Sequence, residues 1–187
     1  AGQGRHVSLL WESVRPGGRG LYADGQQTGQ QSQSGRNKGS ARAGWEYLHV
    51  CMDDVSRAAY TAILADETAE SAIKFLWFAI AWYVSHGIKV ERVLTDNGVC
   101  YKPWKFRDVC RELGVKHKRT RPCHPQTNGK AERFIRTALK EWAYAQTYAH
   151  SWKRTAHLPV WTEYYNFQRP HSAFGRKPPT LAITEGE

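Results

Sequence analysis

The stretch IKVERVLTDNG at residues 88–98 decides the fold, because a strand pattern in it runs directly into a polar turn. Residues 88–95 predict a buried strand. Asp96, Asn97 and Gly98 follow, and such residues favour tight turns. In open α/β sheets, ligands bind beyond the carboxyl ends of the strands. We therefore expect Asp96 to lie at such an end, where its carboxylate either shapes the turn or binds a ligand.

Strand and helix patterns alternate on both sides of this stretch. Residues 5–14 predict a strand, and the segments WEYLHVCM and AAYTAIL predict a hairpin whose turn holds an Asp–Arg contact. The remaining segments predict a helix from Asp66 or Thr68 to Gly87, the strand at 88–95, a helix at 103–113, a strand at 115–120 and a third helix after Gly129. This alternation predicts an α/β fold in which helices cover a sheet.

The spacing of apolar residues predicts which helix faces are buried. The first helix is expected to bury one face, made of Ala72, Ile73, Leu76, Ala79, Ile80, Tyr83 and Val84. The third helix is expected to bury Ala131, Phe134, Ile135, Ala138, Leu139 and Trp142. Three tryptophans at helical spacing, Trp77, Trp82 and Trp142, are predicted to lie in the core.

A second carboxylate, Glu132, begins the third helix, within the segment NGKAERF at 128–134. Arg136 and Lys140 follow it at intervals of four on a face beside the apolar stripe. Taken alone, Glu132 is most simply a solvated residue that pairs with Arg136. Together with Asp96 on a separate element and basic residues between them, it suits a divalent metal site that acts on a phosphodiester.

The net charge of +10 is concentrated around these two carboxylates. Residues 102–140 contain 12 basic and 3 acidic side chains, a local charge of +9. Such a patch attracts polyanions, so nucleic acid is the predicted partner. The residues expected to contact phosphates are Lys118, Arg119, Arg121, Asn128, Lys130, Arg133, Arg136 and Lys140.

Length and composition bound the domain organisation. A chain of 187 residues suits one packed domain. Residues 15–44 hold 8 Gly and 5 Gln but a single acid, which predicts a flexible segment. We therefore divide the chain into residues 1–44, a degenerate first strand with this segment, and residues 45–187, a core with a C-terminal helical extension. The four cysteines show no CxxC pair and no regular spacing, which predicts a reduced, cytoplasmic protein. No apolar run approaches the length that spans a membrane, so no membrane partner is expected.

Three segments, VLTDNG (93–98), HPQTNGKAERFIRT (124–137) and YYNFQRPHSAFGRKPP (164–179), resemble the catalytic core of bacterial insertion-sequence transposases, which are relatives of retroviral integrases. The resemblance implies a ribonuclease-H-like three-layer fold with a mixed sheet of about five strands. It also implies strand transfer of a DNA 3′-hydroxyl by two aspartates and a glutamate that bind two Mg²⁺ (or Mn²⁺) ions when DNA is bound. Asp96 matches the second aspartate and Glu132 the glutamate. The implied partners are double-stranded DNA, as transposon ends and target, and further copies of the chain in a homo-oligomer on DNA.

The first strand departs from the pattern of that family. Aligning RHVSLLWESVRPGG with the family's first strand puts Ser8 where the first catalytic aspartate stands. Glu12, four residues later, is the nearest carboxylate on this segment and shares a strand face with Ser8. The third metal ligand is therefore either at the Ser8 position or Glu12. Three functions stay open: an impaired transposase, a catalytically inactive DNA-binding remnant, and a nuclease that transfers the strand to water.

Overall fold

The computed structural model describes residues 5–14, 46–120 and 129–181. The Gly/Gln-rich segment and most of the loop that precedes the third helix lie outside these ranges. Predicted flexibility of residues 15–44 therefore stays a prediction. The same holds for the phosphate contacts expected of Arg121 and Asn128.

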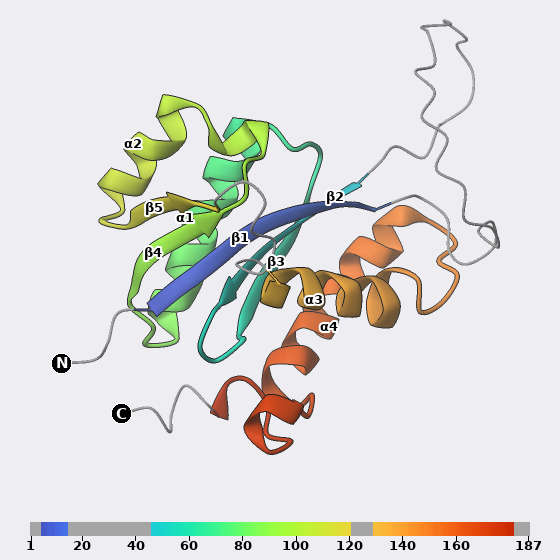
Figure 1. The fold of residues 1–187 in the computed structure, drawn as a ribbon. Coiled ribbons are helices and arrows are strands. Elements are labelled where there is room, and N and C mark those ends of the chain that lie inside the picture. Colours follow the sequence, from blue (N-terminus) through green and yellow to red (C-terminus); the bar gives the residue numbers. More distant parts are fainter. Residues whose placement is uncertain (1–4, 15–45, 121–128, 182–187) are drawn as a thin grey trace, which may run out of the picture.

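A mixed five-stranded sheet forms the centre of the molecule (Figure 1). Its strands are β1 (Arg5–Val14), β2 (Glu46–Asp53), β3 (Ala59–Leu64), β4 (Val90–Thr95) and β5 (Lys116–Arg119), in the order β3-β2-β1-β4-β5. The three strands β1, β2 and β3 are antiparallel, whereas β4 runs parallel to β1 and β5 parallel to β4. The predicted element order and the mixed sheet are confirmed.

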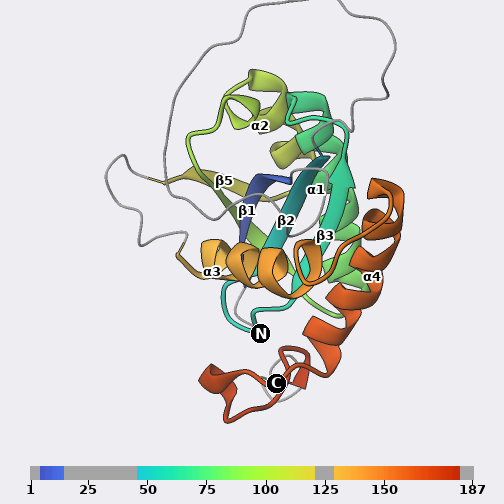
Figure 2. The ribbon, with the colours of Figure 1, turned by 90° about the vertical axis from the view of Figure 1, so that its right-hand side faces the viewer.

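Helices cover both faces of this sheet (Figure 2). On one side lie α1 (Ala69–Ser85) and α2 (Trp104–Glu112), and on the other α3 (Gly129–Ala138) and α4 (Ser151–Phe167). Shorter helical turns are η1 (Val99–Tyr101), the π-helical η3 (Leu139–Ala143) that continues α3, and η4 (Ser172–Phe174). None of the helices in the described part of the chain combines the length and apolar character that crossing a membrane requires.

The central strand β1 separates two hydrophobic cores. Val7 and Leu9 belong to the core under α1 and α2, whereas Leu10 and Val14 belong to the core under α3 and α4. Because side chains alternate across a strand, a slip of one residue would exchange these faces. Burial on both faces therefore fixes the register of β1 against its neighbours, and with it the position of Ser8.

Helix α1 differs from its prediction in one respect. Thr68 caps it, since its hydroxyl oxygen accepts a hydrogen bond from the Ser71 amide at 3.3 Å. Phe75 is buried, but Trp77 and Val84 are 46% and 63% exposed, so their predicted place in the core is wrong. The buried face consists of Ala72, Phe75, Leu76, Ala79, Ile80 and Tyr83, and Trp77 lies outside it.

Asn166 in α4 satisfies the open edge of the sheet. Its Oδ1 accepts a hydrogen bond from the Ala59 amide at 2.9 Å, and its Nδ2 donates to the Ala59 carbonyl at 2.8 Å. Ala59 begins β3, the edge strand on this side. The Asn166 carbonyl accepts from the Thr180 amide and hydroxyl. The side chain thus joins α4 to the sheet, and the backbone carbonyl of the same residue joins α4 to the segment after it.

We expect Asn166→Ala to lower the free energy of unfolding by about 2–3 kcal/mol, because it leaves a buried amide and a buried carbonyl without partners. Urea denaturation measures this change. Gln168→Ala, at an exposed position just after the same helix, is the matched control and should change stability by less than about 0.5 kcal/mol. Equal effects of the two substitutions would contradict the role given to Asn166.

Candidate active site

Asp96 lies directly beyond the carboxyl end of β4, as predicted. The parallel pairing of β1 and β4 sets Leu9 beside Thr95, so Asp96 follows at the level of Leu10. Leu10 belongs to the core under α3 and α4. The alternation of side chains therefore puts the half-buried Asp96 on the face of the sheet that α3 covers.

A tight turn holds one oxygen of this carboxylate. Asp96 Oδ1 accepts a hydrogen bond from the Gly98 amide at 2.8 Å. A Cβ atom at residue 98 would lie 2.8 Å from the same oxygen and 3.4 Å from the Tyr101 ring. Glycine is therefore required here, because any side chain would displace the carboxylate. The turn-forming role and the ligand role of Asp96 are compatible, since the turn uses Oδ1 and no hydrogen bond to Oδ2 occurs among the described residues.

Thr95 and His117 support the backbone at Asp96. The Thr95 hydroxyl donates to the Asp96 carbonyl at 3.0 Å and lies 2.9 Å from His117 Nε2. A hydroxyl that donates its one hydrogen must accept from the imidazole, so Nε2 carries the hydrogen in this arrangement. Burial lowers the pKa of His117, and the nearby Arg119 and Arg107 lower it further, which keeps the ring neutral. This pair from neighbouring strands positions Asp96.

Glu132 lies in the first turn of α3 and is exposed. The helix packs on β1 and β2 through a buried face that includes its neighbour Ala131. The start of the helix is fixed by Lys130, whose Nζ lies 2.8 Å from Asp54 Oδ1 in the turn between β2 and β3. Within the described ranges, Glu132 makes no ion pair or hydrogen bond, so the simple pairing with Arg136 does not occur. Its carboxylate is available to a ligand.

Ser8 and Glu12 share the face of β1 that α3 covers. They pair with Met52 and Leu48 of β2, and both of these partners belong to the core under α3 and α4. Glu12 Oε1 accepts from the Ser13 amide at 3.1 Å, and Glu12 lies two residues beyond the level of Asp96. Ser8 lies two residues before that level, toward the turn that holds the start of α3. Ser8 is therefore the better placed of the two to face both Asp96 and Glu132.

Three oxygen donors thus lie on one side of the sheet: the carboxylates of Asp96 and Glu132 and the hydroxyl of Ser8. Oxygen ligands suit Mg²⁺, which keeps several waters and uses substrate phosphates when few carboxylates are present. By donor type this set suits a hydrated cation, and a hydroxyl stands where a third carboxylate would add negative charge. Among the described residues, at this site or elsewhere, no group of three or more His, Cys, Asp or Glu side chains is placed to hold a metal.

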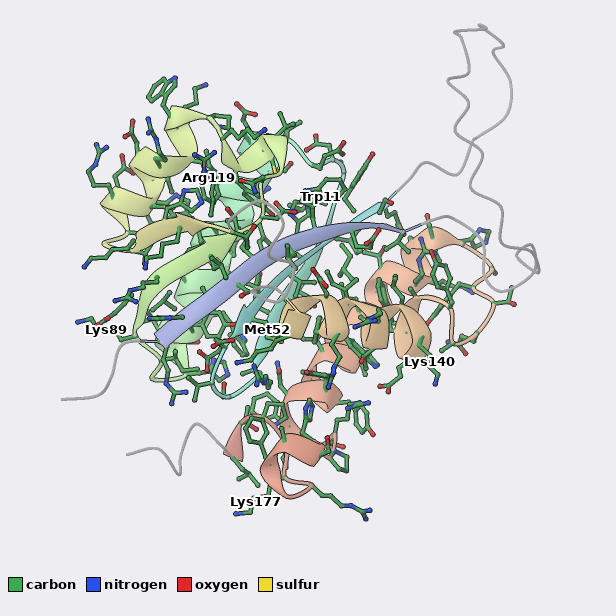
Figure 3. All side chains as sticks on the ribbon, viewed as in Figure 1. Trp11, Met52, Lys89, Arg119, Lys140 and Lys177 are labelled. Carbon is green, nitrogen blue, oxygen red and sulfur yellow. The ribbon has the colours of Figure 1, made fainter. Side chains whose placement is uncertain are left out.

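Exposed cations border these donors on two elements. Lys118 and Arg119 end β5, and Figure 3 shows Arg119 at that end of the strand. On α3 and the turn that continues it, the exposed cations are Lys130, Arg133, Arg136 and Lys140. The structure thus sets six of the predicted phosphate contacts on the surface, and Arg121 and Asn128 lie outside the described residues.

Three other polar or aromatic residues, Asp53, Tyr101 and Trp104, lie outside this donor set. Asp53 is fully buried and accepts from the Ser56 amide and hydroxyl and from Arg5, so it holds the hairpin turn as predicted. Tyr101 is buried as a loop anchor, whereas Trp104 is 63% exposed.

Comparison with known proteins identifies a family and relatives. Two family models described as integrase core domain match residues 113–179 and 33–125. The chain is 35% identical to the transposase InsD for insertion element IS2D of Escherichia coli (strain K12) over 86 residues. These matched residues make up 46% of this chain and 29% of that protein. Over 93 residues the chain is 33% identical to the insertion element IS2A uncharacterized 48.2 kDa protein of Escherichia coli, 50% of this chain and 22% of that one. The chain thus spans less than a third of the length of these two relatives.

Solved structures with the same fold are integrase catalytic cores. The core domain of BIV integrase gives a TM-score of 0.60 at 22% identity, over 75% of this chain and 86% of that chain. The HTLV-2 integrase catalytic core in complex with magnesium gives a TM-score of 0.56 at 16% identity, over 92% of this chain and 91% of that chain. A chain of the simian T-cell lymphotropic virus intasome, solved in complex with a PP2A regulatory subunit, gives a TM-score of 0.61 at 19% identity, over 95% of this chain and 56% of that chain. These likenesses confirm the ribonuclease-H-like fold.

Proposed function

Because the chain belongs to the integrase core domain family, which the two matching models and the transposase relatives establish, we propose that it carries out DNA transposition or integration by phosphoryl transfer. The observation that supports this most is the placement of Asp96 and Glu132 on one side of the sheet, neither paired with a cation in the described residues. Asp96 is half-buried, and buried structural carboxylates are normally paired, as Asp53 is with Arg5; Glu132 is exposed, so this comparison concerns Asp96 alone. A ligand role accounts for the difference.

The residues would divide the work as follows. Asp96 and Glu132, with the oxygen at the Ser8 position, would hold Mg²⁺ or Mn²⁺. When bound, such an ion supplies charge that activates the attacking oxygen and stabilises the leaving oxygen. The turn at Gly98 and the support from Thr95 would keep the Asp96 carboxylate in place. Surrounding cations would orient the phosphodiester, since positioning is a large part of catalysis in phosphoryl transfer.

The basic residues at the end of β5 test the DNA partner. We expect Lys118→Ala with Arg119→Ala to weaken binding of any duplex and to flatten the plot of log K against log salt by about one unit for each lost phosphate contact. Fluorescence anisotropy of a labelled duplex at several salt concentrations measures both. Lys74→Ala with Lys89→Ala is the matched control, because both lysines are exposed and Lys89 lies at the opposite end of the sheet (Figure 3). Equal slopes for the two double variants would contradict this assignment.

Ser8 favours a second candidate, a DNA-binding protein of the same fold that does not turn over. A labelled oligonucleotide incubated with the chain and Mn²⁺ separates the alternatives. Joined strands support transposition, strands cleaved without joining indicate a nuclease, and intact strands under conditions of measured binding indicate the inactive form. Intact strands without binding would overturn the whole proposal.

We further propose that the chain acts on DNA as a homo-oligomer. The support is the structural likeness to a protein solved in an intasome. Analytical ultracentrifugation with and without duplex DNA tests this, and a monomer in both samples would contradict it.

A further inference from the structure

A second surface feature borders α3 next to the face that carries Glu132. It is a groove of about 700 Å³ between α3 and the segment that follows α4, with Met52 and Phe134 among its lining residues. The cationic and imidazole side chains that line it are Arg57, Lys130, Arg133, Arg136, Arg169 and His171. We call it the basic groove. Met52 pairs with Ser8 across β1 and β2, so the basic groove borders the candidate active site.

The chain assembles the basic groove from three distant segments. Arg57 comes from the turn between β2 and β3, three cations come from α3, and Arg169 and His171 come from the segment after α4. Figure 1 shows that segment below α3, beside the end of α4. Arg57 has a left-handed backbone conformation (φ 66°), which few residues other than glycine adopt. Bringing like charges together from three elements opposes folding unless an anion offsets the repulsion.

The cations of the basic groove are only partly neutralised by the protein. Asp54 contacts both Arg57, at 3.6 Å, and Lys130, at 2.8 Å. Glu141 holds Arg169 through two hydrogen bonds of 2.7 and 2.9 Å. Neither acid lines the groove, and no acidic side chain does among the described residues. Arg133 and Arg136 have no acidic partner in that part of the chain, so five cations face two carboxylates.

His171 provides an independent sign of a ligand. Its Nε2 is buried and has no hydrogen-bond partner among the described residues, while its ring stands edge-on to Tyr165 at 4.8 Å. Burial lowers the pKa of His171, and Arg169 and Arg57 lower it further, against a smaller opposing effect of Glu141. A buried polar atom without a partner is costly, and because the His171 ring lines the groove, an anion seated there would lie beside that ring.

Helix geometry relates the basic groove to the candidate active site. Successive residues of an α-helix are rotated by about 100°, so Arg133 lies about 100° around α3 from Glu132, and Arg136 lies between them. A DNA backbone that leaves Glu132 would therefore pass Arg136 before it reaches Arg133 and the wall formed by His171. The groove continues the cationic surface of α3 away from the reacting position.

We propose that the basic groove binds phosphates of the DNA backbone next to the segment that reacts, with Arg133 and Arg136 on one wall and Arg169 and His171 on the other. This inference rests on the proposed function, since it assigns a second contact to the same DNA. It adds a role for the segment after α4, in which the sequence predicted no phosphate contact.

The wall formed by the segment after α4 gives the sharpest test. Ala173 lines the basic groove and is exposed, so Ala173→Glu puts a carboxylate among its cations without removing a contact. Ala156→Glu is the matched control, because Ala156 is exposed on α4 and lies half a turn around that helix from Tyr165, which lines the groove. With a labelled duplex at about 100 mM salt, we expect Ala173→Glu to raise Kd on the order of tenfold and the control to change it by less than about twofold.

A second measurement does not depend on a variant. NMR titration of the His171 ring, with and without inorganic phosphate, is expected to show a higher pKa when phosphate is present, because an anion beside the ring favours its protonated form. Tight duplex binding by the parent chain, with equal Kd values for the two glutamate variants and no response of His171, would overturn the basic groove and leave the proposed function standing. Failure of the parent chain to bind any duplex would overturn both.

Discussion

Ser8→Asp is expected to raise the rate of Mg²⁺-dependent strand joining by on the order of a hundredfold or more over the parent chain, because it would add a third carboxylate to Asp96 and Glu132 for holding the ion. Ser8 is only 5% exposed and lies in the central strand between Met52 and Leu94. The new carboxylate would face the side of the sheet that carries Asp96 and Glu132. Joining of a labelled oligonucleotide measures the gain.

Stability should change together with activity, and in a direction that depends on the metal. Without a cation, a desolvated carboxylate at residue 8 should lower the free energy of unfolding by about 1–3 kcal/mol. An ion that binds the folded chain but not the unfolded chain adds about 2.7 kcal/mol to the free energy of unfolding when its concentration is one hundred times Kd. MgCl₂ should therefore restore the melting temperature of the Ser8→Asp chain. The parent chain, with two carboxylates and a hydroxyl, should respond far less.

Two controls decide whether residue 8 is the missing ligand. Ser8→Asn introduces a side chain of nearly the same shape as aspartate but without its charge. This variant should lose stability and should not recover it in MgCl₂. Glu12→Gln, made in the Ser8→Asp chain, should leave the metal response intact, because Glu12 faces its own neighbour Ser13. A Ser8→Asp chain that neither joins strands nor gains stability from Mg²⁺ would show that the first strand is wrongly aligned with the family.

Local patterns were enough to predict the elements and the α/β class, because each element carries its own periodicity, whereas the ribonuclease-H-like mixed sheet was predicted from the family resemblance. Residues 88–95 predicted β4 to within two residues of its start, and the Gly114 stop after α2 is a left-handed glycine. The error in α1 has a physical cause. Nearly all of FLWFAIAWYV is apolar, so the sequence did not mark which side faces the sheet, and Trp77 was assigned to the core.

The candidate site was predictable only in part. Asp96 and Glu132 stood out through the turn and the charge around them, and the structure sets both on one side of the sheet. Thr95 and His117 were missed because their contact depends on the register between β4 and β5, which neither segment reveals alone. The basic groove was missed because Arg57, on its third wall, is 76 residues from Arg133 (133 minus 57) in the chain.

Glu132→Gln is expected to reduce strand joining by on the order of a thousandfold or more, in the parent chain and in the Ser8→Asp chain alike, because a neutral amide binds Mg²⁺ poorly. Glutamine keeps the size of the side chain, and residue 132 is exposed, so stability should change by less than about 0.5 kcal/mol. Both chains are needed, since the parent alone is expected to join strands slowly.

DNA binding gives the sign that separates a catalytic carboxylate from a structural one. In metal-free buffer, a carboxylate that faces the reacting phosphodiester repels it, so Glu132→Gln should bind a duplex slightly more tightly than the parent. Glu112→Gln, at an exposed position on α2, is the matched control and should leave both joining and affinity unchanged. Equal loss of joining and of binding in Glu132→Gln would instead mean that the residue holds α3 in place, because a helix that shifts would take Lys130, Arg133 and Arg136 away from the DNA together with the carboxylate.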